Sequence, residues 1–467
     1  MKILFVIKRI DYGDHIAISY LSSIAKELGH STFLCIMDNK DIYKTVEDIK
    51  PNIIAYSANA VGYDQMVEAN SRLKEKYSFI SIMGGPQPTF NQDLFLSSSM
   101  DVFCIGEGDI AFRDFLIKIE NSESFDDIPN LITKNRINPV RNLIEDLGEL
   151  PIPDRSLTLE NSFLKGTSKK TFYTSRGCPF SCSYCCNNIY NNMYRGKGKI
   201  VRRFPVDYVI KEMKQVLNKY TMDFVKIGDD IFAYKADKWL EEFTEKYSKE
   251  IGLPFNCYLR LDMVDDKLLS LLKRAGCHSV LLSVDSCSNY IREKILNRKW
   301  KDINIEENIK LIHKYKIKTW VNFMLAAPES TIKNELESIY LGHKTNVTYT
   351  AYSITTPMRG TDIFTYSVDN GYLDINFDGY KNSSFDYSPL SCFSKKHKNI
   401  INNIYCLGPI VAKLPFPLFQ IGIFIIKHVN TKKFFYKIRK WYLNYNRENI
   451  LFKIDKKKER KNASRKN

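Results

Sequence analysis

The sequence predicts an α/β protein with an N-terminal Rossmann-like parallel sheet, then a partial (β/α) barrel, then a mainly helical C-terminal segment. Three observations predict this order. Apolar runs alternate with helical patterns over residues 1–125, and the alternation resumes at Lys169. After residue 376 the chain is aromatic, interrupted by prolines and finally strongly basic. Strands that alternate with helices are typical of parallel sheets with helices on both faces.

The first domain is expected over residues 1–125, where five apolar runs are predicted to be buried strands. These runs are ILFVI, STFLCIM, NIIAYS, FISIM and DVFCI. Ligands of open α/β sheets bind beyond the carboxyl ends of the strands, where glycines let the backbone approach them closely. Ligand contacts are therefore predicted just after these runs, at Ser57, Gly84, Gly85, Gly106, Glu107 and Gly108. Tight turns alone are the alternative explanation for the glycines.

A linker is predicted over residues 126–160, because the stretch DLGELPIPDR carries Pro151 and Pro153 and the apolar rhythm stops there. The barrel is expected over residues 161–375 and the C-terminal segment over residues 376–467. The clearest helix of the barrel region has apolar residues at the spacing of one helical face: Val206, Val209, Ile210, Met213, Val216, Leu217 and Tyr220. A barrel of this kind places its active site at the carboxyl ends of its strands.

Composition indicates a folded chain in a reducing compartment. The 467 residues are 44% hydrophobic and 26% charged, which excludes a disordered or collagen-like protein. Eleven cysteines are too few for a disulfide scaffold, and the opening MKILFVIKRI does not resemble a signal peptide. The longest uncharged apolar stretch near the C-terminus, LPFPLFQIGIFII, is well short of the roughly 18 residues of a spanning helix. We therefore expect a cytoplasmic protein without a transmembrane anchor.

The strongest signal is the loop SRGCPFSCSYCCNN, which spaces Cys178, Cys182 and Cys185 as Cys-x3-Cys-x2-Cys. Three thiolates within eight residues can converge on one soft metal site, as zinc or iron–sulfur chemistry requires. A structural zinc site needs four closed ligands, and no second cysteine pair follows. Cys186 is treated as a neighbour, not as a fourth ligand. A cluster held by three cysteines leaves one iron open to a small molecule.

This loop, with Tyr184 before its last cysteine, resembles that of the radical S-adenosylmethionine (SAM) superfamily. The resemblance implies that Cys178, Cys182 and Cys185 bind a [4Fe-4S] cluster whose fourth iron is chelated by SAM. It also implies that electron transfer cleaves SAM to a 5′-deoxyadenosyl radical, which abstracts hydrogen from a substrate carbon. An electron donor such as flavodoxin or ferredoxin is then expected as a partner.

Further stretches resemble one branch of that superfamily, the enzymes with a cobalamin-binding domain, over residues 1–375. The matching stretches are Gly84-Gly85-Pro86-Gln87-Pro88-Thr89, Gly106-Glu107-Gly108-Asp109, DLGELPIPDR, Gly228-Asp229-Asp230-Ile231-Phe232, Arg260-Leu261-Asp262, Leu272-Lys273-Arg274-Ala275-Gly276-Cys277 and TTPMRGTDIF. The resemblance implies cobalamin in the first domain, with Ser57 and Gly84-Gly85 near its nucleotide tail. It further implies SAM contacts at Asp229, Asp230, Arg260 and Asp285.

Two stretches depart from the family pattern. Where the family has Gly-Ile-Glu-Ser-Gly, this chain has Ser283-Val284-Asp285-Ser286-Cys287, and where it has Gly-x-Pro-Gly-Glu-Thr, this chain has Ala326-Ala327-Pro328-Glu329-Ser330-Thr331. Both changes add side chains where a cofactor normally approaches the backbone. The family's Asp-x-His-x-x-Gly loop, which supplies a cobalt ligand in many members, is absent, and His15 is expected to be an ordinary loop histidine.

The leading hypothesis is a radical SAM enzyme that uses cobalamin for C-methylation, or for a radical rearrangement, of a small-molecule or natural-product intermediate. A radical SAM methylthiotransferase is the first alternative, but such enzymes carry three further cluster cysteines in the first domain, which here has only Cys35 and Cys104. A non-catalytic cobalamin- or SAM-binding sensor is the second. No substrate or catalytic residue is identified from the sequence.

The C-terminal segment carries most of the net charge of +16, since residues 431–467 contain 14 Lys and Arg against 3 Asp and Glu. Its tail, KIDKKKERKNASRKN, is open to interpretation as a solvated tail, a membrane-surface patch or a nucleic-acid arm. No recognition module for nucleic acid is present, so no nucleic-acid partner is expected. Bulky apolar and basic residues before the tail favour peripheral membrane contact, with packing against the barrel as the alternative.

Overall fold

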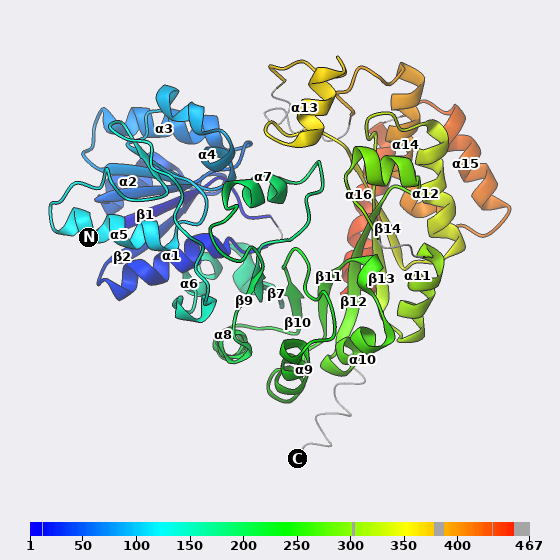
Figure 1. The fold of residues 1–467 in the computed structure, drawn as a ribbon, viewed down its shortest axis with the longest axis horizontal. Coiled ribbons are helices and arrows are strands. Elements are labelled where there is room, and N and C mark those ends of the chain that lie inside the picture. The colour runs from blue at the N-terminus through cyan, green and yellow to red at the C-terminus, as the bar shows by residue number, and fades with distance from the viewer. Residues whose placement is uncertain (12, 301–303, 378–386, 432, 453–467) are drawn as a thin grey trace. The chain divides into compact units, whose positions relative to one another are not determined.

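The computed structural model describes residues 1–11, 13–300, 304–377, 387–431 and 433–452 (Figure 1). The chain divides into two compact units. The first unit comprises Met1–Lys170 and Cys186–Thr221, and the second comprises Thr171–Cys185, Met222–Phe377 and the described residues from 387 onward. The predicted basic tail, residues 453–467, lies outside the described residues.

The first unit contains a sheet with the strand order β2-β1-β3-β4-β5-β6. Its strands are β1 (Lys2–Ile7), β2 (Ser31–Ile36), β3 (Ile53–Ser57), β4 (Ile80–Gly84), β5 (Val102–Cys104) and β6 (Leu131–Thr133). All neighbours pair in parallel except β6, which is antiparallel to β5. The five predicted apolar runs thus form the five parallel strands, and the Rossmann-like prediction is confirmed.

Helices lie between these strands and after them in the chain. They are α1 (Ile16–Glu27), α2 (Ile42–Ile49), α3 (Tyr63–Lys74), α4 (Pro86–Phe90) and α5 (Asp109–Glu120), followed by α6 (Arg155–Leu159), α7 (Cys186–Met193) and α8 (Val206–Lys219), with the short strand β9 (Arg202–Arg203). The predicted face of α8 is buried, including Val209, Ile210 and Met213. Helical amphipathicity therefore located this helix correctly.

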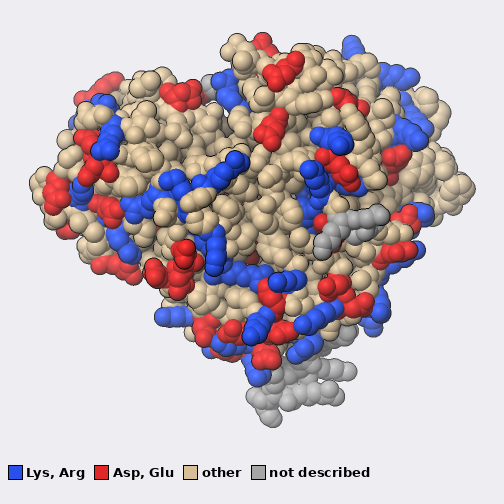
Figure 2. Space-filling model, viewed as in Figure 1, with Lys and Arg blue, Asp and Glu red and all other residues tan. Residues whose placement is uncertain are grey.

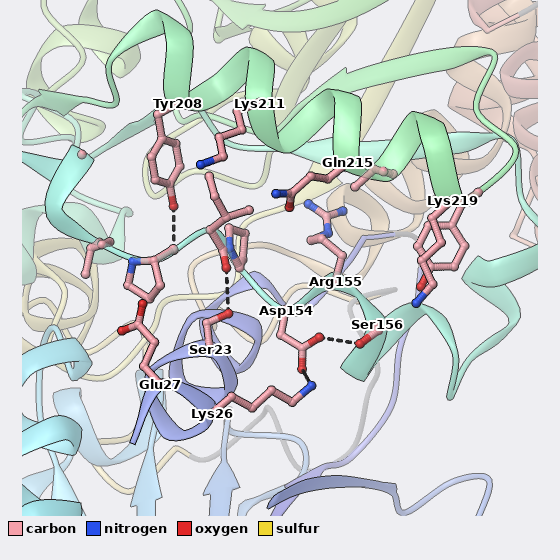
Figure 3. A pocket seen from close by; sticks show the side chains of 17 residues that line it. Ser23, Lys26, Glu27, Asp154, Arg155, Ser156, Tyr208, Lys211, Gln215 and Lys219 are labelled. Atoms are coloured by element: carbon pink, nitrogen blue, oxygen red, sulfur yellow. Dashed lines mark hydrogen bonds and ion pairs between the residues drawn. The ribbon is translucent and has the colours of Figure 1, made fainter. Parts of the chain in front are cut away.

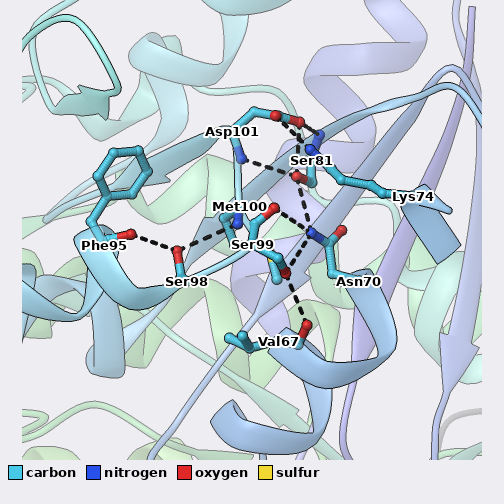
Figure 4. A network of polar contacts seen from close by, with 9 residues as sticks. All are labelled: Val67, Asn70, Lys74, Ser81, Phe95, Ser98, Ser99, Met100 and Asp101. Atoms are coloured by element: carbon cyan, nitrogen blue, oxygen red, sulfur yellow. Dashed lines mark hydrogen bonds and ion pairs between the residues drawn. The ribbon is translucent and has the colours of Figure 1, made fainter. Parts of the chain in front are cut away.

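A polar network fixes the amino-terminal end of the first sheet (Figure 4). The Asp101 carboxylate accepts hydrogen bonds from the Ser81 amide at 2.8 Å and its hydroxyl at 2.9 Å, and Lys74 lies 2.5 Å from the same carboxylate. The Asn70 side-chain amide donates to the Ser99 carbonyl at 2.8 Å. These contacts tie α3 to the start of β4 and to the loop before β5, at the end opposite the predicted ligand edge.

The predicted linker, residues 126–160, is more ordered than its sequence indicates. Leu131–Thr133 forms β6, a strand too short to produce a periodic pattern. The PIPD stretch is held by side chains from two helices: the Ser23 hydroxyl of α1 donates to the Ile152 carbonyl at 2.7 Å, and the Tyr208 hydroxyl of α8 donates to the Pro151 carbonyl at 2.8 Å. The linker is therefore a packed part of the first unit.

A cavity of about 750 Å³ lies between this stretch, α1 and α8 (Figure 3). Lys26 and Asp154 form an ion pair of 2.6 Å at its wall. The buried Arg155 contacts Glu212 at 2.7 Å and Asp14 at 3.0 Å. None of the site residues predicted from the sequence lines this cavity, so we assign it no part in the chemistry.

The second unit is built on a sheet with the order β14-β13-β12-β11-β10-β7. Its strands are β7 (Lys169–Phe172), β10 (Phe224–Ile227), β11 (Phe255–Leu259), β12 (Cys277–Asp285), β13 (Lys318–Leu325) and β14 (Tyr349–Ile354); the short β8 (Ser175–Arg176) follows β7. From β10 to β14 each neighbouring pair is parallel. The open sheet confirms a partial barrel.

Helices follow the strands of this sheet. They are α9 (Lys238–Glu250), α10 (Asp266–Ala275), α11 (Ile305–Lys314), α12 (Ile332–Lys344) and α13 (Asp362–Asp369). Helix α9 shows why they pack here: Phe243 and Tyr247 lie one turn apart and both contact Phe255 of β11, at ring-centroid distances of 6.2 and 5.3 Å. Burial of such aromatic rings is a major source of core stability.

The C-terminal segment is helical, as predicted, with α14 (Lys395–Val411), α15 (Leu418–His428) and α16 (Lys433–Asn446). Helix α14 packs against β14 and α12, and both α15 and α16 pack against α14. In the part of the chain that the structure describes, no helix is long and apolar enough to cross a membrane.

Candidate active site

The cysteine loop leaves the short strand β8 at the carboxyl end of the second unit's first strand. Cys182 is buried, whereas Cys178 and Cys185 are partly exposed. The Cys185 amide donates a hydrogen bond of 3.0 Å to the Cys182 carbonyl, which closes a turn between these two cysteines. The loop ends where α7 begins, at Cys186. Cys182 and Cys185 therefore share one turn, and Cys178 precedes it by four residues in the same loop.

The three thiols interact electrostatically. Burial is the main cause that raises the pKa of the Cys178 thiol to about 12, and the nearby Asp230, Cys185 and Cys182 contribute to the same increase. Among the described residues no three His, Cys, Asp or Glu side chains surround a single metal position. An iron–sulfur cluster takes each cysteine on a different iron, so its ligands do not need to meet around one ion. The donor set fits a cluster with three protein ligands.

A buried charge network lies beside the loop. The Arg298 guanidinium contacts the Asp285 carboxylate at 3.0 Å and lies 3.9 Å from the Cys182 sulfur. The Tyr184 hydroxyl donates to the same carboxylate at 2.7 Å. Burial raises the pKa of the Cys182 thiol, and the charge of Arg298 opposes that increase. A guanidinium placed here complements the negative charge of thiolates on a cluster.

The backbone of β12 positions Asp285 for these contacts. The register with β13 shifts between Ser283 and Asp285, a bulge that turns the side chain at the end of the strand. Asp285 has a φ of +63°, in the left-handed region that side chains other than glycine rarely occupy. Strain of this kind often occurs at functional sites. The residue predicted to contact SAM thus lies beside the cysteine loop, held by Tyr184 and Arg298.

Arg260 stands at the carboxyl end of β11 and supports the loop from another side. Its guanidinium lies 3.7 Å from the centroid of the Phe180 ring, within the cysteine loop. Two hydrogen bonds of 2.9 Å to Asp262 and one of 2.8 Å to the Lys299 carbonyl fix its orientation. A desolvated cation over an aromatic face is worth about 2 kcal/mol. The structure therefore uses Arg260 to hold the loop.

Asp229, at the end of β10, is also held by hydrogen bonds within the protein. Its carboxylate accepts hydrogen bonds from the Thr174 amide at 2.6 Å, from the Thr174 hydroxyl, and from the Ser175 amide at 3.3 Å. Burial raises the pKa of Asp229 to about 6 although these hydrogen bonds oppose the increase. Asp229 thus anchors the chain just before the cysteine loop, while its neighbour Asp230 is exposed.

The departures from the family pattern at the end of β13 keep a glycine-like backbone. Ala326 has a φ of +58° and Glu329 a φ of +66°. Glu335 of α12 stabilises this loop, because its buried carboxylate accepts hydrogen bonds from the Ala326 amide at 2.9 Å and the Ser330 hydroxyl at 2.5 Å. Burial raises the pKa of Glu335 to about 7. The exposed Glu329 carboxylate accepts a hydrogen bond of 2.6 Å from Tyr290.

In the first unit, the strand register brings two predicted contacts together. Ser57 pairs with Gly84, so both lie at the carboxyl edge of the sheet, and each is partly exposed. Gly85 has a φ of +101°, and a Cβ there would lie 2.6 Å from the Ala58 carbonyl oxygen. The fold itself therefore requires glycine at 85, as the tight-turn alternative proposed.

The loop Gly106-Glu107-Gly108 is held by residues that follow the cysteine loop. The Tyr194 hydroxyl accepts hydrogen bonds from the Glu107 amide at 2.8 Å and from the Asn130 side chain at 3.2 Å. A Cβ on Gly106 would lie 2.1 Å from that hydroxyl. Arg202 binds the Glu107 carboxylate with two hydrogen bonds, one of them 3.0 Å long. The side chain of Glu107 thus has a structural role.

His15 precedes α1, and its Nε2 lies 3.1 Å from the Arg9 carbonyl oxygen. Burial lowers the pKa of His15. A ring nitrogen that donates to the backbone is occupied, which agrees with the interpretation of His15 as a loop histidine.

Sequence reasoning missed three residues of these sites: Arg298, Phe180 and Tyr194. Arg298 follows β12 by thirteen residues and belongs to no short motif, so only the fold reveals its contact with Asp285. Phe180 lies inside the cysteine motif, where an aromatic side chain next to metal ligands was a usable signal. Tyr194 lies far from the Gly106 loop in sequence.

Comparison with known proteins identifies both units. Residues 172–339 match the radical SAM superfamily, and residues 4–116 match the B12 binding domain. The protein is therefore a radical SAM enzyme that carries a cobalamin-binding domain. It is of the cobalamin-dependent, methyltransferase-like kind, and its cofactors are a [4Fe-4S] cluster, SAM and cobalamin.

Relatives cover most of the chain. An uncharacterized methyltransferase of Pyrococcus horikoshii is 26% identical over 400 residues, which are 80% of this chain and 84% of that protein. The anaerobic magnesium-protoporphyrin IX monomethyl ester cyclase of Rubrivivax gelatinosus is 20% identical over 377 residues, 74% of this chain and 65% of the relative. The structure of the cobalamin-dependent SAM radical enzyme OxsB with aqua-cobalamin shares the fold, with a TM-score of 0.68 at 16% identity over 95% of this chain and 73% of that one.

Proposed function

We propose that this enzyme transfers a methyl group from SAM to a carbon atom of a small molecule. The observation that carries the proposal is the presence, in one chain, of a B12-binding domain and a radical SAM domain whose cysteine loop lies beside a buried guanidinium. The relative from Pyrococcus horikoshii, named as a methyltransferase, supports the same reaction class. Cobalamin supplies a carrier for the methyl group, and the cluster supplies the electron that cleaves SAM.

Within this proposal, Cys178, Cys182 and Cys185 bind the cluster. Asp230 and Asp285 are candidate SAM contacts because they stand at strand ends beside the cysteine loop. Arg260 and Asp229, also predicted as SAM contacts, are assigned first to holding the loop, through Phe180 and Thr174. On the first unit, Ser57 and Gly84 are the partly exposed residues from which a cobalamin tail would be contacted.

The domain boundaries that accompany this proposal are 1–125 for cobalamin binding, 126–160 for the linker, 161–375 for the barrel and 376–467 for the C-terminal segment, although the linker and Cys186–Thr221 pack within the first unit. A flavodoxin or ferredoxin is the proposed electron donor, since radical SAM enzymes require an external electron. Three cysteines must stay reduced to bind the cluster, which supports a reducing, cytoplasmic compartment.

A methylthiotransferase has less support. Such an enzyme needs further cluster cysteines in its first domain, and here Cys35 and Cys104 are both buried. Burial raises the pKa of the Cys104 thiol to about 12. The match of residues 4–116 to a B12-binding domain gives that domain another cofactor. Because the relatives are enzymes, the sensor alternative is not retained.

The proposal is tested with anaerobically reconstituted enzyme, reductant and SAM that carries a deuterated methyl group. Release of S-adenosylhomocysteine reports loss of the methyl group from SAM, and release of 5′-deoxyadenosine reports reductive cleavage. Methyl transfer predicts both products, and the first should require cobalamin. If 5′-deoxyadenosine alone appears at the same rate with and without cobalamin, the enzyme performs a radical rearrangement instead.

A matched pair of variants controls this experiment. Cys182→Ala removes a cluster ligand and should abolish 5′-deoxyadenosine release. Cys186→Ala removes the adjacent thiol, which begins α7, and should leave that release within about twofold of the wild type. Equal loss in both variants would point to a general disturbance of the loop.

A further inference from the structure

Helix α15 exposes an apolar face that the proposed function does not use. Leu418, Ile421 and Phe424 lie on successive turns of one side, and Ile421 and Phe424 are 54% and 60% exposed. Phe416, just before the helix, is 71% exposed. Contiguous exposed apolar surface of this kind marks an interaction site.

The orientation of α15 is fixed by its other face. Phe419, Ile423 and Ile426 are buried, and α15 packs along α14. Gly422 approaches α14 so closely that a Cβ there would lie 2.8 Å from the Val411 side chain. The exposed residues therefore cannot turn inward without separating the two helices.

Charge indicates what covers the exposed face. Residues 387–447 contain eleven Lys and Arg and neither Asp nor Glu. Lys433, Lys437 and Lys440 are exposed on α16, which begins shortly after α15 ends. Over most of the face shown in Figure 2, both charge signs are interspersed. The segment that contains α15 and α16, both of which pack against α14, thus suits a partner that is negative and apolar.

Exposed aromatic residues of α16 also suit an apolar partner. Phe434 and Trp441 are 62% and 65% exposed, and Trp441 stacks on Tyr445 at a centroid distance of 5.9 Å. The Arg439 guanidinium lies 3.9 Å from the centroid of the Tyr405 ring of α14, which holds α16 in place. Tryptophan and tyrosine are enriched at the level of lipid headgroups.

We propose that α15 and α16 form a docking surface for an anionic lipid bilayer. The exposed apolar side chains of α15 would enter the interfacial layer, and the lysines of α16 would pair with lipid phosphates. Exposed aliphatic and aromatic side chains next to lysines are typical of interfacial helices, and anionic headgroups attract clustered Lys and Arg. A bilayer satisfies both the apolar and the basic residues, whereas a second copy of this segment, which has no Asp or Glu between residues 387 and 447, would repel the first.

The test is flotation of the full-length, cofactor-loaded enzyme with vesicles of phosphatidylcholine and phosphatidylglycerol, compared with vesicles of phosphatidylcholine alone. The wild type should bind the mixed vesicles, and binding should weaken as salt increases. Ile421→Glu/Phe424→Glu should lower the affinity more than tenfold. Lys433→Gln/Lys437→Gln should also lower it more than tenfold, because each basic residue near an anionic surface contributes about fivefold.

Leu96→Glu is the matched control, since Leu96 is 90% exposed on the first unit and should leave binding unchanged. All the substituted side chains are exposed, so unaltered circular dichroism and unaltered 5′-deoxyadenosine release verify folding. Failure of the wild type to float with the mixed vesicles would overturn the proposal. So would a dimer in solution that Ile421→Glu/Phe424→Glu splits, because α15 would then be a subunit interface.

Discussion

The Arg298 guanidinium lies 3.0 Å from the Asp285 carboxylate, and both side chains are buried beside the cysteine loop. The same guanidinium reaches the Cys182 sulfur at 3.9 Å, and the same carboxylate accepts the Tyr184 hydroxyl at 2.7 Å. One ion pair therefore connects the end of β12 to two residues of the loop that is predicted to hold the cluster.

Arg298→Gln should impair cluster retention, because it leaves the Asp285 charge buried without its partner. Breaking a buried pair in this way costs roughly 3–5 kcal/mol. Iron per chain after anaerobic reconstitution and desalting should fall well below the wild-type value. In Arg298→Gln/Asp285→Asn the unpaired charge is gone, so thermal stability should recover in part while iron retention stays low. Full iron content in Arg298→Gln would contradict this role.

Phe180→Leu should loosen the cysteine loop by removing the ring that Arg260 covers at 3.7 Å. The lost cation–π contact is worth about 2 kcal/mol, or roughly thirtyfold in an equilibrium constant. The measurement is the rate of iron transfer to a chelator under anaerobic conditions, which should increase by about tenfold or more. Phe163→Leu, at a position that is 55% exposed on the first unit, serves as the control. An unchanged rate in Phe180→Leu would show that the stacking does not hold the loop.

Tyr194→Phe should weaken cobalamin binding. Removing the hydroxyl leaves the Glu107 amide and the Asn130 side chain without the acceptor that now lies 2.8 and 3.2 Å away. A buried donor without a partner costs about 1–3 kcal/mol. Titration of the cofactor-free enzyme with hydroxocobalamin should show a dissociation constant at least fivefold higher than in wild type. Tyr43→Phe, on the exposed face of α2, should not change it.

Glu335→Gln should remove a pH dependence of stability. Burial raises the pKa of Glu335 from 4.5 to about 7. A carboxyl with a raised pKa contributes stability that is complete below about pH 4.5 and is lost as the pH rises through 7. Between pH 4.5 and pH 8 the free energy of unfolding of the wild type should therefore fall by roughly 2–3 kcal/mol relative to that of Glu335→Gln. Urea unfolding of both proteins across this range gives the comparison, and parallel stability curves would contradict the assignment.

The fold was largely predictable because its signals are local. Apolar runs such as ILFVI mark buried parallel strands, and the stripe through Val209, Ile210 and Met213 marks the buried face of a helix. β6 was missed since three apolar residues have no period, and the order of the linker comes from long-range hydrogen bonds to Ser23 and Tyr208. Contacts that join distant segments leave no trace in a single sequence.

The candidate site was predictable only where its residues lie in local motifs. The cysteines share one short motif, and Asp285 ends a recognisable strand. Arg298 and Tyr194 gain their roles only from the approach of distant segments. The glycines at 85 and 106 were predicted as ligand contacts, but their lack of a side chain is explained by the Ala58 carbonyl and the Tyr194 hydroxyl.

The central claim is that one chain holds both a cluster in its three-cysteine loop and cobalamin on its first unit. Metal analysis of anaerobically reconstituted, desalted enzyme tests it most directly. The account predicts about four irons and one cobalt per chain, with the iron lost and the cobalt retained in Cys182→Ala. About eight irons without cobalt, or iron retained in Cys182→Ala, would contradict it.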